Sequence, residues 1–235
     1  MAEGLAAHSS SEPPPLSALA LSSSDAERSA RYAEVRSRLA LLLEGERDWV
    51  AAMATTACEL HEAFAYYHWT GWYRAEGVRS PSILGPRARG RLDLPSTLVV
   101  GPYQGSLGCL RIPFARGVCG AAARLGKTQL VPEVHAFPGH IACASSTQSE
   151  VVVPLFAARW EAAQEETKTN RRPEECDAAN DEEGGKPSSP QLVASLTQTV
   201  AAVLDVDSDH PDAFREVDAK ELEELCRWLS ERRWD

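Results

Sequence analysis

Apolar residues recur at helical spacing in three segments of the chain. The pattern predicts one helix from Ala26 onward, a second over residues 47–64 and a closing helix from Asp218. In each segment these positions, apolar apart from Thr56, recur at the i, i+3, i+4 spacing of a helix, so they share one face that would be buried. These positions are Tyr32, Val35, Leu39 and Leu42, then Trp49, Met53, Thr56, Leu60 and Phe64, and finally Leu222, Leu225, Cys226 and Leu229.

Short runs of β-prone residues lie between these helices and predict strands. We expect strands at residues 66–73, 98–100, 129–131, 150–156 and 200–208, and a short helix over 118–125. Glycine and proline at 101–105 should turn the chain, and residues 80–95 should form an irregular loop. Helices, then a run of strands, then a helix favour an α+β domain with an antiparallel sheet. In that sheet we expect the strand at 150–158 to pair with the one at 197–207.

Two segments lack a pattern that could build a core. Residues 1–25 are rich in Ser, Pro and Ala, which predicts a disordered tail. Residues 161–190 hold nine acidic and four basic residues, with almost no large apolar side chain. Such a stretch cannot bury enough surface to offset its ordering entropy. We therefore expect one domain over residues 26–235, with a flexible acidic insertion at 161–190.

Size and charge exclude some classes of partner. A chain of 235 residues is long enough for one good-sized core or at most two small domains. A net charge of −10 argues against a nucleic acid or an anionic membrane, since both attract positive charge. No apolar run reaches the roughly 20 residues of a membrane helix, and no signal-peptide core follows the first residues. We expect a cytoplasmic protein, in which thiols stay reduced.

Three of the six cysteines gather in a polar, glycine-rich stretch, residues 97–156. Cys109, Cys119 and Cys143 are ten and twenty-four residues apart, whereas Cys58, Cys176 and Cys226 are scattered singly. Structural zinc sites usually hold closely spaced cysteine pairs, which are missing here. A mixed zinc site is the weaker alternative, and its ligands would be Cys119, His135, His140 and Cys143. Three thiols that could converge in space favour instead a redox cycle, in which one thiol attacks and a second resolves the product.

Acidic residues lie at the edges of two apolar strands. Glu150 precedes the apolar run at 151–155, and Asp205 and Asp207 alternate with apolar neighbours. Successive strand residues point to opposite faces, so Asp205 and Asp207 share one face. An acid at a strand end is usually solvated, but paired carboxyl groups beside a thiol cluster favour a pocket. There they could hold an ammonium group, or stay protonated and act as a general acid.

Five short motifs carry a resemblance to a known family. They are VVGPYQG at 99–105, GVCG at 117–120, GHIAC at 139–143, SEVVVPL at 149–155 and VLDVDS at 203–208. Together they resemble the free methionine-(R)-sulfoxide reductase family, whose members are small enzymes built on a GAF domain. The resemblance covers roughly residues 47–230 but not the tail or the insertion. It implies a single GAF domain, with helices on one face of an antiparallel sheet and the pocket on the other.

The resemblance also implies an activity, the reduction of free L-methionine-(R)-S-oxide to methionine. Cys143 would attack the sulfoxide sulfur and become a sulfenic acid. Cys109 would resolve it as a Cys109–Cys143 disulfide, and thioredoxin would reduce that disulfide. Cys119 is similar to the third family cysteine, an alternative resolver or relay. No cofactor is implied, and the sequence is compatible with a homodimer.

The resemblance further assigns residues to the pocket. Glu150 and Asp207 are expected to act in catalysis as pocket acids. A second set is expected to bind substrate: Asp205, Glu133, and the aromatic pair Trp69 and Tyr73, whose alternative role is core packing. Two positions differ from the family pattern: Glu133 stands where the family has Asp, and Ala144 where it has an acid. The competing hypothesis is a GAF module that only binds a ligand or senses oxidation.

Overall fold

The computed structural model describes residues 15–78, 96–141, 143–157 and 199–234. The first part of the predicted tail, the predicted loop at 80–95, the acidic insertion and Cys176 lie outside these residues. The described helices are α1 (Asp25–Leu42), α2 (Trp49–Ala63), α3 (Gly117–Leu125), the 3₁₀ helix η1 (Val134–Ala136) and α4 (Glu216–Ser230). The strands are β1 (Trp69–Ala75), β2 (Thr97–Gln104), β3 (Arg111–Pro113), β4 (Gln129–Val131), β5 (Ser149–Phe156) and β6 (Val200–Ser208).

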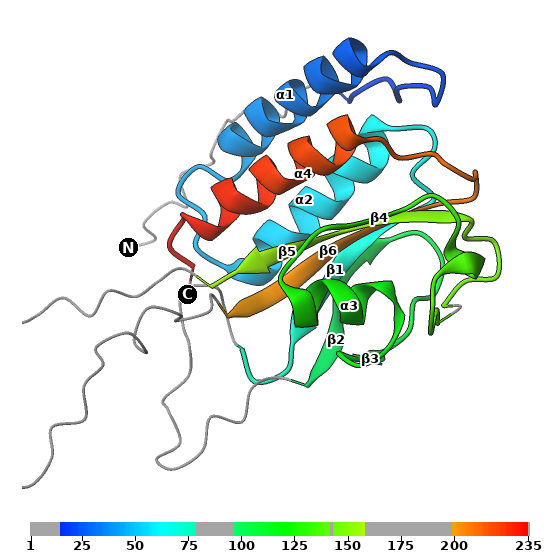
Figure 1. Ribbon diagram of the computed structural model, residues 1–235. Helices are drawn as coiled ribbons and strands as arrows, with labels where there is room; N and C mark the ends of the chain where they lie inside the picture. Colours follow the sequence, from blue (N-terminus) through cyan, green and yellow to red (C-terminus); the bar gives the residue numbers. More distant parts are fainter. Residues whose placement is uncertain (1–14, 79–95, 142, 158–198, 235) are drawn as a thin grey trace, which may run out of the picture.

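The strands form one six-stranded antiparallel sheet in the order β3-β2-β1-β6-β5-β4. Helices α2 and α4 cover one face, and α1 packs across them as an outer layer (Figure 1). The short helix α3 lies on the opposite face, against β3 to β6 (Figure 1). The predicted α+β class and the predicted pairing of β5 with β6 are both confirmed. No helix of the described residues has the length and apolar character to cross a membrane.

The helical face of the sheet carries the larger core. Nearly all the apolar positions that predicted the helices are buried there, Leu42 being only partly covered. Trp72 of β1 lies at its centre against Trp49, with ring centroids 5.7 Å apart, and its indole N–H donates to the Met53 carbonyl at 3.1 Å. Helices α1 and α2 begin where Ser24 and Asp48 accept hydrogen bonds from backbone N–H groups of the first turn. The apolar faces of these helices and their N-terminal caps therefore determine how the helical layer packs on the sheet.

Side chains of β5 and β6 alternate between the two faces of the sheet. Val151, Val153 and Leu155 of β5 pack toward the helical core, while Val152 joins a second apolar cluster on the α3 face. On β6, Leu204 and Val206 likewise face the helices. The period of two residues therefore turns the acidic positions between them toward the α3 face.

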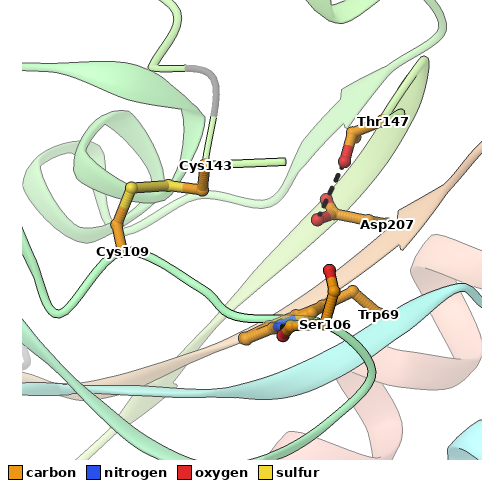
Figure 2. Close-up of a disulfide and its surroundings, with 6 residues drawn as sticks. All are labelled: Trp69, Ser106, Cys109, Cys143, Thr147 and Asp207. Carbon is orange, nitrogen blue, oxygen red and sulfur yellow. Dashed lines mark hydrogen bonds between the residues drawn. A yellow bond between two sulfur atoms is a disulfide. The ribbon is translucent and has the colours of Figure 1, made fainter. Parts of the chain in front are cut away.

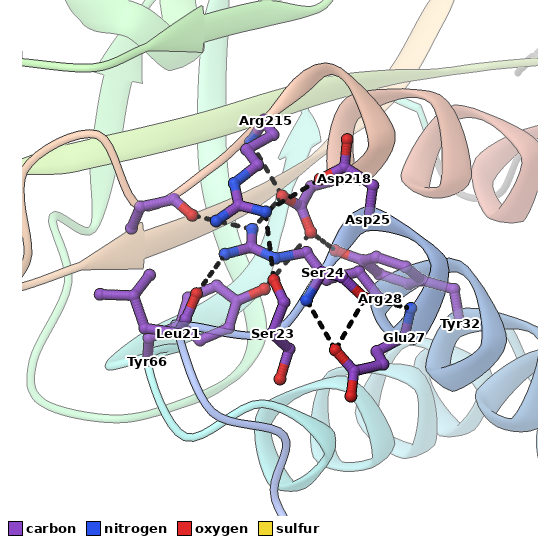
Figure 3. A network of polar contacts seen from close by, with 11 residues as sticks. Leu21, Ser23, Ser24, Asp25, Glu27, Arg28, Tyr32, Tyr66, Arg215 and Asp218 are labelled. Atoms are coloured by element: carbon purple, nitrogen blue, oxygen red, sulfur yellow. Dashed lines mark hydrogen bonds and ion pairs between the residues drawn. The ribbon is translucent and has the colours of Figure 1, made fainter.

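A network of polar contacts ties α1 to α4 inside the helical layer (Figure 3). The Arg28 guanidinium forms an ion pair with Asp218 and also donates to the Ala213 and Leu21 carbonyls, at 2.9 and 2.8 Å. Asp218 additionally accepts hydrogen bonds from the hydroxyls of Tyr32 and Tyr66. These residues bury an ion pair whose polar groups are almost all matched.

Residues 15–24, which the composition assigns to the tail, lie against this layer. Leu19 forms a β-bridge with Phe64, and its N–H donates to the Ala63 carbonyl at 2.8 Å. Leu16 and Leu21 also pack on the helical core. Three leucines among the serines and prolines are enough to hold this stretch in place.

The structure corrects the predicted course of the second strand. Glycine and proline at 101–102 were expected to turn the chain, but β2 runs through them to Gln104. The β1–β2 register shifts between Gly71 and Tyr73, so Pro102 lies at a bulge. A bulge leaves a strand residue unpaired, which suits a residue without an N–H. The other differences are small: β1 begins at Trp69, α4 begins two residues early, and β3 and η1 were not predicted.

Candidate active site

Three carboxyl groups meet on the α3 face of the sheet. Glu150 on β5 lies directly opposite Asp207 on β6 in the strand register, and Asp205 lies two residues before Asp207 on the same strand. All three side chains are buried. The period of two residues predicted the shared face of Asp205 and Asp207, and the antiparallel pairing adds Glu150 to it.

Helix α3 brings Cys119 to these acids. Gly120 lets the helix approach β3 closely, because a Cβ there would lie 2.5 Å from the Pro113 carbonyl oxygen. The Cys119 thiol is buried and lies close to the Asp205 carboxyl. One ligand atom each from Cys119, Glu150 and Asp205 lies within 4.8 Å of the others, so these residues, among those described, could hold a metal ion. The mixed zinc set, which the sequence left as the weaker alternative, is not formed in this structure because Cys143 is in a disulfide.

Cys109 and Cys143 form a disulfide in the loops that cover the acids (Figure 2). The bond joins the β2–β3 loop to the segment that precedes β5, with a Cα–Cα distance of 5.2 Å. This is the pairing that the resemblance implied. Cys58, Cys119 and Cys226 are free thiols.

A cavity of about 30 Å³ lies between the disulfide and the acids. Its apolar wall includes Ile112, Val118 and Ile141, and Cys143 also lines it. Room for one water requires roughly 10–15 Å³ on this measure. The disulfide form therefore has space for a few water molecules beside the carboxyl groups, but not for an amino acid.

Burial raises the pKa of each of the three carboxyl groups. For Asp205 the pKa is raised to about 7, while the hydrogen bond from Cys119 opposes the effect of burial. For Glu150 and Asp207 the pKa lies well above the usual value, first because of burial and then because of neighbouring carboxylates. Burial and the same acids also raise the pKa of Cys119. At neutral pH the cluster therefore retains protons.

The acids have few partners for their charge. The Thr147 hydroxyl donates to Asp207 at 3.4 Å, and Asp205 Oδ1 is buried without a hydrogen-bond partner. Among the described residues, no Lys or Arg lines the cavity. A buried carboxyl oxygen without a donor is a place where a ligand's N–H group would be stabilised. The cluster thus offers both transferable protons and unfilled acceptors.

Some of the predicted pocket residues lie further out. Trp69 and Tyr73 are buried on the α3 face with their rings stacked 5.7 Å apart, below the β2–β3 loop and outside the cavity lining. Glu133 is exposed and caps η1, where it accepts a hydrogen bond from the His135 N–H at 3.0 Å. His140 lines the cavity, and burial lowers its pKa.

Thr147 and the apolar wall were missed by sequence reasoning. Thr147 stands two residues before β5 in a polar stretch that ends in Gln148, so nothing in the pattern separates it from Ser145 or Ser146. Ile112 belongs to β3, a strand of three residues. Such short elements leave no periodic signal.

The arrangement of a six-stranded antiparallel sheet, helices on one face and a covered pocket on the other is that of a GAF domain. A solved GAF domain structure superposes with a TM-score of 0.61 over 92% of this chain and 93% of its own, at 23% identity. No family profile matches the chain.

Closer relatives define the family. The X-ray structure of free methionine-R-sulfoxide reductase from Neisseria meningitidis in complex with its substrate has 34% sequence identity to this chain and a TM-score of 0.61. The match covers 92% of this chain and 94% of that chain. GAF domain-containing protein A of Dictyostelium discoideum is 30% identical over 206 residues, which is 88% of this chain and 94% of that protein. The chain belongs to the free methionine-(R)-sulfoxide reductase family.

Free methionine-R-sulfoxide reductase of Escherichia coli is 36% identical over 124 residues. That match spans 53% of this chain and 64% of the relative, which is less than two thirds of its length.

Proposed function

We propose that this protein reduces free L-methionine-(R)-S-oxide to methionine through a cysteine sulfenic acid and a disulfide. The observation that carries the proposal is the Cys109–Cys143 disulfide beside three buried carboxyl groups whose pKa values are raised. Thiol-based reduction of a sulfoxide needs a nucleophile, a proton donor and a second thiol, and this site offers all three.

Cys143 is the attacking residue, because its segment borders the cavity that the acids line. Its sulfur bonds to the sulfoxide sulfur, and the oxygen passes to the cysteine. Methionine leaves as the thioether, and Cys143 becomes a sulfenic acid. The Cys109 thiol then displaces that oxygen as water, and the disulfide forms. Each cycle consumes two thiols, converts one sulfoxide and releases one water.

Protonated carboxyl groups support the first step. Breaking the S–O bond places negative charge on the oxygen, and Glu150 or Asp207 can donate the proton that neutralises it. Both acids have a pKa well above the usual value, so they still hold protons at neutral pH. An ionised acid of the same cluster, with Asp205 as our assignment, would bind the ammonium group of the substrate.

This ammonium contact supports a preference for the free amino acid. A methionine sulfoxide inside a peptide has a neutral amide in place of the ammonium group, and it would leave a buried carboxylate unpaired. We keep Trp69 and Tyr73 as proposed wall residues of the substrate pocket, which the substrate would contact once the covering loops have moved. The proposed preference for the R configuration is inferred from the family alone.

The disulfide requires an external dithiol before the next cycle, and we propose thioredoxin for this role. Exchange with a thioredoxin-type dithiol regenerates the two thiols. Cys119 has no disulfide partner here, and its raised pKa makes it a slow nucleophile in this state. It therefore remains a proposed relay rather than a required resolver.

A single-turnover experiment tests the proposal. Fully reduced protein is mixed with the sulfoxide in the absence of reductant, and methionine and free thiols are counted. We expect one methionine released and two thiols lost per protein molecule. Cys143→Ser should release none. Cys109→Ser should release one methionine and stop as a sulfenic acid, which a dimedone probe labels.

Cys226→Ser and Cys58→Ser are the matched controls, because both thiols are free and lie outside the cavity. They should behave as the unmodified protein does. Turnover retained in Cys143→Ser would contradict the assignment. No turnover in the unmodified protein would favour the alternative of a ligand-binding or redox-sensing module.

A further inference from the structure

Two largely exposed leucines flank Cys109 in the β2–β3 loop. Leu107 is 82% exposed and Leu110 is 74% exposed, and they are the two most exposed large apolar side chains among the described residues. Cys109 lies between them, half-buried in its disulfide. Single exposed apolar residues are common, but a pair on both sides of a redox-active cysteine marks an apolar patch at a reaction centre.

The loop is held so that these leucines cannot turn inward. Its backbone lies directly on the aromatic pair below it, since a Cβ at Gly108 would come within 3.0 Å of the Tyr73 hydroxyl and 3.1 Å of the Trp69 ring. The Trp69 indole N–H donates to the Ser106 carbonyl at 3.1 Å (Figure 2). Trp69 and Tyr73 fill the space under the loop, and the leucine side chains point to solvent.

The two sulfurs of the disulfide differ in what surrounds them. Both cysteines are half-buried, but Cys143 lines the cavity with the acids, whereas Cys109 does not line it and lies between the exposed Leu107 and Leu110. An attacking thiolate must approach along the line of the S–S bond, on the side away from the leaving sulfur. Approach to Cys109 comes from the loop surface, and approach to Cys143 comes from the side of the cavity that the acids line. The geometry favours attack at Cys109.

We propose that Leu107 and Leu110 form the docking surface for a dithiol protein reductant, which attacks Sγ of Cys109. This inference rests on the proposed function and names the surface that its last step uses. The reductant thiolate bonds to Cys109 Sγ, the Cys109–Cys143 bond breaks, and Cys143 leaves as a thiolate. The second thiol of the reductant then attacks its own sulfur in the mixed disulfide, which releases Cys109 as a thiol and the reductant as a disulfide.

The disulfide argues for this occupant rather than for another protein surface. A patch used for permanent association would bury Cys109 and block its reduction, whereas a reductant must cover that sulfur for a short time. Contacts of two leucine side chains provide a small apolar interface, which is typical of transient redox encounters. A small thiol such as dithiothreitol needs no such contact, so the two kinds of reductant can be distinguished.

The experiment compares thioredoxin with dithiothreitol as the reductant of the oxidised protein. We expect the double variant Leu107→Ser/Leu110→Ser to lose about tenfold in kcat/KM for thioredoxin, through a higher KM, while the dithiothreitol rate stays unchanged. The control is Leu41→Ser/Val50→Ser, which removes two exposed apolar side chains from α1 and α2. This control should change neither rate.

A trapping experiment identifies the attacked sulfur. Thioredoxin that lacks its resolving cysteine should form a mixed disulfide with the unmodified oxidised protein. Peptide mapping should find the link at Cys109. A link at Cys143, or equal losses with both reductants, would overturn the inference. A change in the sedimentation coefficient of the leucine double variant would assign the patch to a contact between two copies of this chain.

Failure of the proposed function gives a different result. In that case no sulfoxide is reduced with dithiothreitol either, although thioredoxin can still reduce the disulfide. The dithiothreitol arm therefore separates an error in the activity from an error in the docking surface.

Discussion

Two clusters of buried polar groups in this protein treat their carboxyl groups in opposite ways. In the helical layer, both Asp218 oxygens are occupied: one accepts from Tyr32 and Tyr66, the other from Arg28 and the Arg215 N–H (Figure 3). On the α3 face, Glu150, Asp205 and Asp207 have no arginine or lysine among the described residues that line their cavity. One cluster is completed by the chain itself. The other is left to be completed by protons or by a ligand.

The difference shows how burial alone fails to identify a functional acid. Burying a charge costs several kcal/mol unless partners compensate, and at Asp218 the chain provides those partners. At the second cluster the cost appears as raised pKa values instead. Buried groups with such perturbed pKa values are found mainly at functional sites. We therefore expect substitutions at the two clusters to affect different properties, stability in the first and activity in the second.

The largest expected effect is on activity, at Glu150. Glu150→Gln keeps the shape of the side chain but removes its transferable proton. A missing general acid typically costs about 10²–10⁴-fold, so kcat/KM for the sulfoxide should fall by roughly that factor. The melting temperature should stay the same or rise, because a buried ionisable group is lost. Steady-state assays and thermal unfolding of the same sample measure both, and near-normal activity would contradict the role of Glu150.

Asp218→Ala should have the largest effect on stability. It leaves the Arg28 charge buried without its counterion, and breaking a buried pair in this way costs roughly 3–5 kcal/mol. Urea unfolding measures this loss. The matched change Arg28→Met/Asp218→Leu should recover part of it, since no unpaired charge remains. The fraction that stays folded should reduce the sulfoxide at the normal rate, and a specific loss of kcat would show that the two clusters are coupled.

Asp205→Asn should give a pH-dependent gain in stability. The pKa of Asp205 is about 7 in the folded state, against an ordinary value of 3.8. Between these values the folded protein binds the extra proton, so stability falls as pH rises and is lowest above pH 7. The variant removes this penalty.

The melting temperature of Asp205→Asn should therefore exceed that of the unmodified protein by roughly 5 °C at pH 8, which corresponds to about 2 kcal/mol in the free energy of unfolding. The two melting temperatures should match near pH 4. Thermal unfolding across that range measures the difference. A constant difference at all pH values would contradict a raised pKa at this residue.

The smallest expected effect is at Thr147. Its hydrogen bond to Asp207 is long, at 3.4 Å, and a neutral hydrogen bond contributes about 1 kcal/mol. Thr147→Val should lower kcat/KM by about two- to fivefold, with little change in stability. Ser146→Ala, which removes an exposed hydroxyl paired with His68, is the control and should have no effect on rate. A loss as large as that of Glu150→Gln would mean that Thr147 itself contacts the reacting atoms.

Periodicity was enough to predict much of the fold. The buried faces of α1, α2 and α4 follow the helical spacing of their apolar residues, and the period of two residues placed Asp205 and Asp207 on one face. Periodicity could not predict that β2 continues through Gly101 and Pro102, because that depends on a bulge in β2 where it pairs with β1. Elements of three residues, such as β3 and η1, carry no periodic signal.

The candidate site was only partly predictable, for a physical reason. The meeting of Glu150 with Asp207 depends on the strand register, and the disulfide depends on two loops that meet across 34 residues of sequence. The motif resemblance implied both. It also assigned Glu133 to the pocket. In the structure Glu133 is exposed and caps η1, so its role in the pocket stays a prediction. The docking leucines gave no signal at all, because exposure is decided by what fills the space beneath a loop.

The most direct test of the account is turnover of four separate substrates: the R and S diastereomers of methionine sulfoxide, each free and within a peptide. Reduced protein is assayed with dithiothreitol, so that the result does not depend on a protein reductant. We predict that free L-methionine-(R)-S-oxide is reduced and that the other three are not. Equal reduction of the peptide-bound R form would contradict a pocket whose buried carboxylate binds the substrate's ammonium group. No reduction of any of the four would contradict the proposed activity itself.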